Sequence, residues 1–226
     1  GGRGRGGRGG RLGARPGGAG RSAHRARVSS GRPAWRLPPS DLARRALPIV
    51  ELPAGTAVVR IHTVGRNPRY FGRTGQARFD APDGSYGVCY CGLDDAAAFV
   101  ETILRDQDLG GIAQADLASH AIADGVLVRP ARLVAFGGTG LRRLRATAGT
   151  VHATYRVTQA WSHALWAHPD QPDGIRYRSR FDDDQHCVAL FDRAAAAVRF
   201  TASAPLSAVP LRLGAMLDRY GLALYE

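Results

Sequence analysis

Three charged residues lie where a charge is costly unless it is paired or binds something. Arg60 interrupts the apolar run TAVVRIHTV, Arg78 follows a basic, glycine-containing loop, and Glu101 lies beside the apolar stripe of a predicted helix. Two arginines near a carboxylate can hold a pyrophosphate through bidentate contacts while the carboxylate addresses a sugar. A buried ion pair between Arg60 and Glu101 without a ligand is the alternative, and the pattern alone leaves both open.

Strands and helices alternate along the chain without a regular βαβ rhythm. Residues 56–62, 86–91, 125–135, 175–180 and 186–190 are predicted strands, and residues 39–46, 94–105, 112–121, 151–168 and 211–222 are predicted helices. The glycine cluster at 137–140 lacks the spacing of a phosphate-binding loop and is interpreted as a turn. These elements predict an α/β (α+β) fold, a single compact domain with a mixed β-sheet flanked by helices.

The basic character of the chain is concentrated at its N-terminus. The whole chain carries a net charge of +12, and residues 1–50 hold twelve arginines and one acid, which is a net of +11. Residues 51–226 hold nineteen arginines and eighteen acids, so the body is nearly neutral. We therefore expect residues 1–38 to be a disordered Arg/Gly-rich tail and residues 39–226 to be the folded domain. The tail is either a solvated or over-extended start, or an RNA-binding segment.

The three cysteines predict neither a disulfide framework nor a metal site. Cys89 and Cys91 flank Tyr90 in an alternating run, and on a strand they would share one face as a reduced, buried pair. Since no second Cys/His pair follows at ligand spacing, we expect no metal. No apolar run approaches the roughly 20 residues of a membrane span, and the N-terminal stretch lacks the apolar segment of a signal peptide. The expected location is the cytoplasm, without a membrane partner.

Residues 45–200 resemble the RES domain family in the order and spacing of its motifs. An arginine ends the first strand (Arg60), an Ala77-Arg78-Phe79 element precedes a Pro-Asp-Gly turn, and Tyr90 centres the next strand. A helix then carries Glu101. The segment from Gly174 to Arg180, with Ser179, resembles the serine element that precedes the last motif strand.

The resemblance implies an ADP-ribosyltransferase-like fold that acts on NAD⁺. Arg60 and Arg78 would bind the phosphates, and Tyr90 would stack on or hydrogen-bond the nicotinamide side. Glu101 would be the catalytic carboxylate, and Ser179 would fix the substrate beside it. A carboxylate next to the positive charge that develops on the sugar stabilises the transition state more than the ground state.

One position departs from the family pattern. Many members carry tyrosine directly after the first arginine, where this chain has Ile61. Isoleucine packs but cannot hydrogen-bond or stack, so one expected ligand contact is missing. Tyr70 and His62 are the candidate replacements.

The activity that the resemblance implies is cleavage of the nicotinamide–ribose bond by a glycohydrolase or a phosphorylase. Inorganic phosphate would then be a co-substrate, and no cofactor is implied beyond NAD⁺ as substrate. The family implies a toxin that is held inactive by an Xre-like helix-turn-helix antitoxin, in a homo-oligomer or a toxin–antitoxin hetero-oligomer. An ADP-ribosyltransferase that modifies a macromolecule and an RNA-binding protein that acts through its tail are the alternatives. Nucleic acid is otherwise expected only through the antitoxin.

Overall fold

A computed structural model describes residues 1, 35–106 and 111–226. Most of the predicted tail therefore lies outside the described residues. The described residues from Trp35 onward form one compact unit. Arg36 is already bound to this body, because its N–H donates to Thr150 Oγ1 at 3.2 Å and its carbonyl accepts from Trp161 Nε1 at 2.6 Å. Trp161 is fully buried, as expected for a core anchor.

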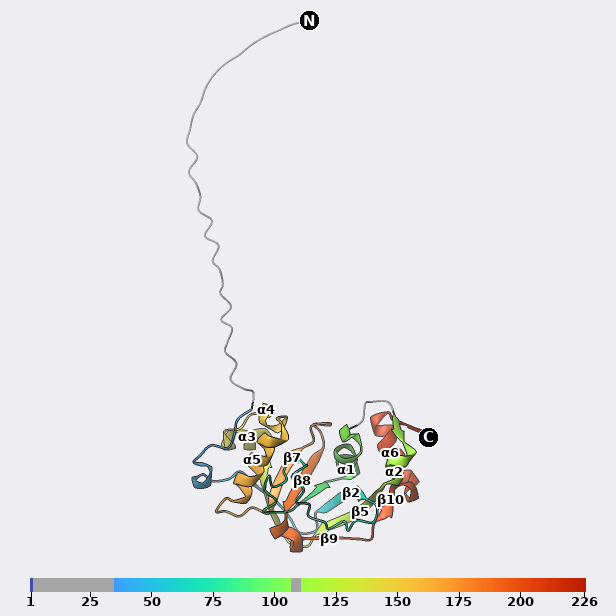
Figure 1. The fold of residues 1–226 in the computed structure, drawn as a ribbon, viewed down its shortest axis with the longest axis horizontal. Helices are drawn as coiled ribbons and strands as arrows, with labels where there is room; N and C mark the ends of the chain where they lie inside the picture. The colour runs from blue at the N-terminus through green and yellow to red at the C-terminus, as the bar shows by residue number, and fades with distance from the viewer. Residues whose placement is uncertain (2–34, 107–110) are drawn as a thin grey trace. The chain divides into compact units, whose positions relative to one another are not determined.

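A large mixed β-sheet forms the centre of the body, and the predicted fold class is confirmed (Figure 1). Its strand order is β1-β6-β7-β8-β3-β2-β5-β10, with β9 also paired to β5. Within the described residues only β6 and β7 of this sheet run parallel. The strands are β1 (Ile49–Leu52), β2 (Ala57–Thr63), β3 (Val88–Gly92), β5 (His120–Leu127), β6 (Ala131–Phe136), β7 (Gly174–Arg178), β8 (His186–Phe191), β9 (Val198–Phe200) and β10 (Ala204–Pro205). A separate parallel pair joins β4 (Gly111–Ala113) to β11 (Ala223–Tyr225).

The sheet consists of two halves that meet at one point. β3 pairs with β8 over its whole length, and β2 pairs with β5 over its whole length. Between β2 and β3, however, Val59 and Gly92 form the one register pair. The two strands therefore diverge beyond this pair, and a sheet that opens in this way leaves a gap for side chains from both strands.

Helices pack on one face of both halves. Next to β6, β7 and β8, this face buries residues of α3 (Gly138–Leu144), α4 (Ala148–Val151) and α5 (Tyr155–Trp166). Next to β2 and β5 it buries residues of α1 (Asp95–Thr102), α2 (Gln114–Ala118) and α6 (Pro210–Tyr220). Because strand side chains alternate, Val58, Cys89 and Cys91 point to the opposite face and form a third cluster. No helix in the described ranges has both the length and the apolar content to cross a membrane.

Short 3₁₀ segments complete the elements. They are η1 (Leu42–Arg44), η2 (Leu104–Asp106), η3 (Asp192–Ala197) and η4 (Leu206–Ala208). The helix predicted over 39–46 is thus reduced to η1.

Two stretches of predicted structure are divided differently from the prediction. The segment 112–121 was predicted as one helix, but it holds the end of β4, the short helix α2 and the start of β5. The segment 125–135 was predicted as one strand and is the end of β5, a turn and β6. Pro130 lies in that turn and has no N–H for a sheet ladder, which explains the break.

Two further corrections concern the region 137–168. The glycine cluster opens α3 instead of forming a turn, and Gly140 lies so close to Ala135 that an added Cβ would come within 2.0 Å of the Ala135 carbonyl oxygen. This glycine therefore allows a helix to approach β6. The helix predicted over 151–168 is α4 followed by α5, with a break at residues 152–154.

Gly92 gives a testable case of the same kind at the junction of the two sheet halves. A Cβ at this position would lie 2.3 Å from the amide nitrogen of Ala98 and 2.6 Å from the carbonyl oxygen of Asp94. We predict that Gly92→Ala lowers the free energy of unfolding by about 1–3 kcal/mol, because α1 must shift. Urea unfolding followed by circular dichroism measures this change.

The matched control is Gly214→Ala within α6, where an added Cβ meets nothing within 4 Å. This substitution should stabilise the protein by about 0.5–1 kcal/mol. Equal effects of the two substitutions would contradict the close approach of α1 to Gly92.

Candidate active site

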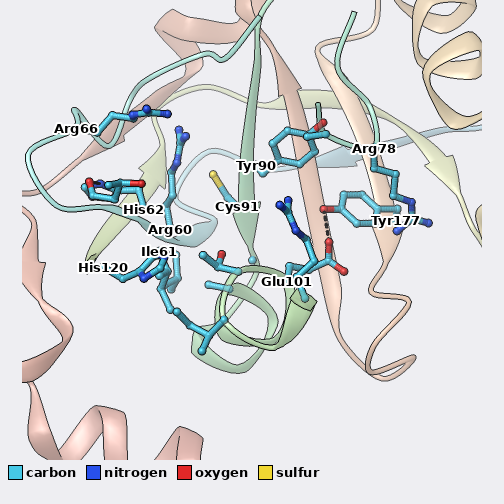
Figure 2. A pocket seen from close by; sticks show the side chains of 18 of the residues that line it. Arg60, Ile61, His62, Arg66, Arg78, Tyr90, Cys91, Glu101, His120 and Tyr177 are labelled. Atoms are coloured by element: carbon cyan, nitrogen blue, oxygen red, sulfur yellow. Dashed lines mark hydrogen bonds between the residues drawn. The ribbon is translucent and has the colours of Figure 1, made fainter. Parts of the chain in front are cut away.

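A cleft of about 560 Å³ opens where β2 and β3 diverge (Figure 2). One wall comes from β2 and the other from β3 and β7, and α1 forms the floor. Arg60, His62, Arg78, Tyr90 and Glu101 all line it, so the structure brings together five of the seven residues that the sequence singled out.

The carboxylate of Glu101 lies on the last turn of α1. The helix begins at an Asp94 N-cap, whose Oδ1 accepts from the Ala97 N–H at 2.7 Å. At its other end, Glu101 Oε2 accepts a 3.2 Å hydrogen bond from the Tyr177 hydroxyl. Glu101 Oε1 is buried and has no partner among the described residues. A buried oxygen without a partner is costly, so it marks a position that a ligand could satisfy.

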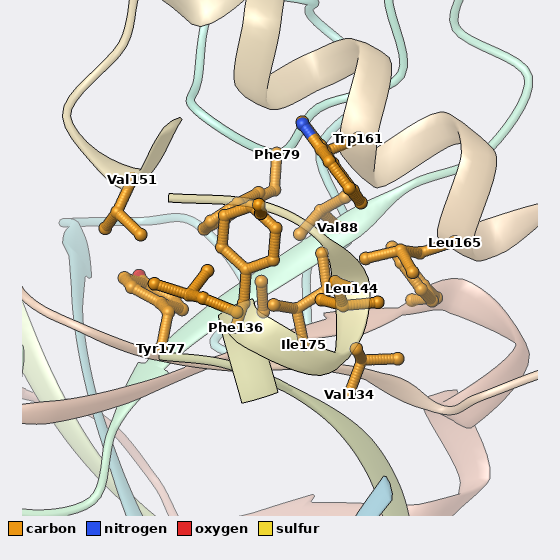
Figure 3. Packing of buried hydrophobic residues seen from close by; sticks show 14 of the residues in the cluster. Phe79, Val88, Val134, Phe136, Leu144, Val151, Trp161, Leu165, Ile175 and Tyr177 are labelled. Atoms are coloured by element: carbon orange, nitrogen blue, oxygen red, sulfur yellow. The ribbon is translucent and has the colours of Figure 1, made fainter. Parts of the chain in front are cut away.

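Arg78 is held in place by the two residues that follow it, Phe79 and Asp80. Phe79 is fully buried against Phe136 and Tyr177 (Figure 3), and Asp80 accepts hydrogen bonds from the Tyr90 hydroxyl and the Ala77 N–H at 3.0 and 3.1 Å. These anchors fix the backbone on both sides of Arg78 and direct its side chain.

The guanidinium of Arg78 is buried and only partly satisfied. Its Nη2 donates to the Val151 carbonyl at 2.6 Å, and the group stacks over the rings of Phe79 and Tyr177 at 5.0 and 5.1 Å. Nε and Nη1 are buried without partners among the described residues. Burial lowers the pKa of Arg78 while Tyr177 and Glu101 oppose that shift, and an arginine remains a cation under such conditions. Arg78 therefore has two nitrogens, Nε and Nη1, whose N–H groups lack partners among the described residues and suit a ligand.

Arg60 projects from β2 across the gap towards β3. Its Nη1 donates to the carbonyls of Pro68 and Tyr70 at 2.8 and 2.7 Å and lies 2.6 Å from Cys89 Sγ. Within the described residues all three contacts run through Nη1, which leaves Nε and Nη2 to a ligand. None of the contacts involves Glu101, so the ion pair considered from the sequence does not form.

Two tyrosines complete this end of the cleft. The Tyr90 hydroxyl donates to Asp80 Oδ1 and accepts from the Phe79 N–H at 2.8 Å. Burial, together with Asp80, raises the pKa of Tyr90, and burial with Glu101 raises that of Tyr177. Both therefore remain neutral phenols. Because the Tyr90 hydroxyl is already engaged, its ring is the part that can contact a ligand.

Two predicted residues lie outside the lining of the cleft. Ser179 is buried, and its Oγ accepts from the N–H groups of Phe181 and Asp182 at 3.1 and 3.4 Å, so it caps the turn after β7. Tyr70 is 39% exposed, and its ring lies 4.9 Å from the guanidinium carbon of Arg66.

Several lining residues were missed from the sequence, notably Tyr177, Arg66 and His120. Tyr177 could have been found, because it lies within the segment Gly174–Arg180 that resembles the serine element of the family. Nothing in the sequence around His120 marks a site, because it lies within the segment 112–121 that was predicted as a helix. Arg66 lies in an exposed loop.

The cysteines are free and buried, as expected, and Cys89 Sγ lies 3.9 Å from Cys91 Sγ. Across the described residues, no group of three His, Cys, Asp or Glu side chains is arranged to hold a metal ion.

Comparison with known proteins places this site in a family. The model of the RES domain matches residues 57–212, which is more than half of the chain. A protein of Sinorhizobium fredii described as "Probable toxin y4kH" is 31% identical over 109 residues, or 48% of this chain and 85% of that protein.

The solved structure of the M. tuberculosis MbcT-MbcA toxin-antitoxin complex holds a chain of similar fold, with a TM-score of 0.53 and 13% identity. The match covers 72% of this chain and 92% of that one. The chain described here belongs to the RES domain family.

Proposed function

We propose that this protein cleaves the nicotinamide–ribose bond of NAD⁺, with Glu101 as the catalytic carboxylate. The observation that carries the proposal is the pair of unsatisfied groups in one cleft, Glu101 Oε1 and the Nε and Nη1 of Arg78. A dinucleotide brings both a sugar that develops positive charge and phosphates that accept hydrogen bonds. Membership of the RES domain family supports the same substrate, because the resemblance to this family implies an activity on NAD⁺.

In the proposed reaction, nicotinamide leaves with the electron pair of the bond to the ribose C1′ carbon. The ribose becomes oxocarbenium-like, and Glu101 Oε1 stabilises the positive charge because the carboxylate is already oriented. Tyr177 holds the other carboxylate oxygen through its 3.2 Å hydrogen bond. Water or phosphate then forms the new bond to C1′ and loses a proton to the solvent. Orientation before the reaction is what lowers the barrier, since no side chain needs to reorganise.

The other lining residues would bind the two ends of the substrate. The exposed face of the Tyr90 ring suits the flat nicotinamide, because the Tyr90 hydroxyl is engaged with Asp80. The remaining N–H groups of Arg60 and Arg78 suit phosphate oxygens. Ser179 acts on this arrangement through the turn that it caps rather than through contact with the substrate.

The biological role that we propose is that of a toxin in a toxin–antitoxin pair. The support is the Sinorhizobium relative described as a probable toxin and the similar fold in a toxin-antitoxin complex. The proposed partner is an Xre-like helix-turn-helix antitoxin. Loss of cellular NAD⁺ would be the toxic event, and the cytoplasm, where NAD⁺ is abundant, would be the site of action.

Glu101→Gln is the decisive variant for this mechanism. The amide retains the size of the side chain but has no negative charge, so NAD⁺ consumption should fall by about 10²–10³-fold or more. The melting temperature should be unchanged or higher, because the variant removes a charge from a partly unsatisfied position. Chromatographic measurement of NAD⁺ and a thermal melt give the two results.

The matched control is Glu51→Gln, which changes an exposed glutamate of β1. This variant should consume NAD⁺ at the parental rate. Full turnover by Glu101→Gln would remove Glu101 from the mechanism. Product analysis with and without phosphate then identifies the acceptor: ADP-ribose-1″-phosphate indicates phosphorolysis, free ADP-ribose indicates hydrolysis, and a labelled macromolecule indicates ADP-ribosyl transfer.

Tyr177→Phe tests the orientation of the carboxylate. Phenylalanine keeps the ring that stacks against Arg78 but removes the hydroxyl that holds Glu101 Oε2. We predict that kcat falls by about 10-fold while KM changes little, because one hydrogen bond to a charged group contributes about 1.5 kcal/mol or more. Steady-state kinetics separates the two parameters. An unchanged kcat would show that Glu101 is oriented without Tyr177.

A further inference from the structure

The outer end of the cleft begins at a tight turn that follows β2. The Arg66 N–H donates to the Thr63 carbonyl at 3.1 Å, and Gly65 adopts a φ of +78°, which glycine tolerates best. Arg66 itself lines the cleft. It lies on the opposite side of Arg60 from Glu101 and Tyr177 (Figure 2). The turn therefore presents a cation at the end of the cleft that lies away from the proposed site of bond cleavage.

His62 helps to hold the turn formed by residues 63–66 through a contact with the Thr63 carbonyl. Its Nδ1 lies 3.0 Å from the Thr63 carbonyl, which can only accept, so Nδ1 carries the proton. Burial lowers the pKa of His62 and favours the neutral ring, so Nε2 accepts from the Ser203 hydroxyl at 2.8 Å. The Val64 N–H also donates to the Ser119 carbonyl at 2.9 Å. With both ring nitrogens engaged, His62 positions the turn and is not itself a ligand contact.

The loop after the turn is also held in place, and it supports the Arg66 side chain. Arg60 Nη1 binds the carbonyls of Pro68 and Tyr70, and the Tyr70 N–H donates to the Asn67 carbonyl at 3.0 Å. Tyr70 in turn places its ring 4.9 Å from the guanidinium carbon of Arg66. A guanidinium that stacks on an aromatic ring loses less conformational freedom when it binds an anion.

Arg66 has no acidic partner in the part of the chain that the structure describes. We propose that Arg66 binds the pyrophosphate-bearing part of the substrate at this outer end, an inference that rests on the proposed function. Arg66 then supplies the polar contact that Ile61 cannot make. Tyr70, which the sequence offered as a replacement at this position, contributes by holding Arg66 rather than by contacting the substrate.

Arg66→Ala tests the inference through binding and turnover together. Titration with ADP, which carries the pyrophosphate but has no bond to cleave, should show a dissociation constant raised by about 10-fold. The KM for NAD⁺ should rise similarly with kcat nearly unchanged, and its dependence on salt should weaken. Tyr70→Leu should raise both constants by a smaller factor, because Arg66 keeps its charge but loses its support.

Arg69→Ala is the matched control, since Arg69 is an exposed arginine of the same loop and does not line this cleft. It should match the parent in both assays. If the parent consumes NAD⁺ and Arg66→Ala behaves like Arg69→Ala, the inference about Arg66 is wrong and the proposed function stands. If the parent does not consume NAD⁺, the proposed function fails. The ADP titration still decides: weaker binding by Arg66→Ala alone supports the site, whereas equal or absent binding overturns it.

Discussion

The single register pair between Val59 and Gly92 is the constraint on which the rest of the site depends. Had β2 and β3 paired along their length, Arg60 and Cys91 would face each other within a continuous ladder and no gap would exist. The divergence requires each strand to satisfy its backbone on its other side, and β5 and β8 do so. Gly92 also lets α1 approach the junction, since any side chain there would meet the first turns of the helix. Gly92 thus forms the register pair between the two halves of the sheet, and its lack of a side chain allows the close approach of α1, the helix of Glu101.

The cleft retains charged atoms that the fold does not satisfy. Arg60 uses Nη1 to hold the loop between Pro68 and Tyr70, whereas Arg78 uses Nη2 to hold Val151, and neither forms an ion pair with Glu101 in the described residues. A fold selected only for stability would bring such charges together or replace them with apolar side chains. Here the buried aromatic groups around Arg78 keep it apart from the carboxylate. The resulting cost in stability leaves these groups without partners inside the cleft.

Local signals in the sequence predicted the parts of the site that depend on one element. The apolar run around Arg60 predicted β2, and the acidic start of the helix predicted α1, where Asp94 is the observed N-cap. The resemblance to a family added Tyr90 and Ser179 to the three charged residues Arg60, Arg78 and Glu101. Features that depend on distant contacts were not predicted. The hydrogen bond from Tyr177 to Glu101 spans 76 residues, and the need for glycine at position 140 arises from the close approach of α3 to Ala135 of β6. Ser179 shows the converse, because the family resemblance implied a ligand contact, whereas its position in a turn engages the hydroxyl locally.

Because Ile61 is apolar, the polar groups at the two ends of the cleft come from different elements. Its side chain packs with Val59, Phe99 and Ile103 beneath β2, so this position contributes to the core that holds α1 in place. A polar contact at the outer end must then come from the neighbouring loop instead of the strand. The loop can provide it because Arg60 and His62 alternate with Ile61 along β2 and point to the opposite face of the sheet. Arg60 binds the loop carbonyls of Pro68 and Tyr70, and His62 binds the carbonyl of Thr63, where β2 ends and the turn begins. The same strand therefore packs against α1, the helix of Glu101, on one face and holds the turn that presents Arg66 on the other, so the geometry of both ends of the cleft depends on the position of β2.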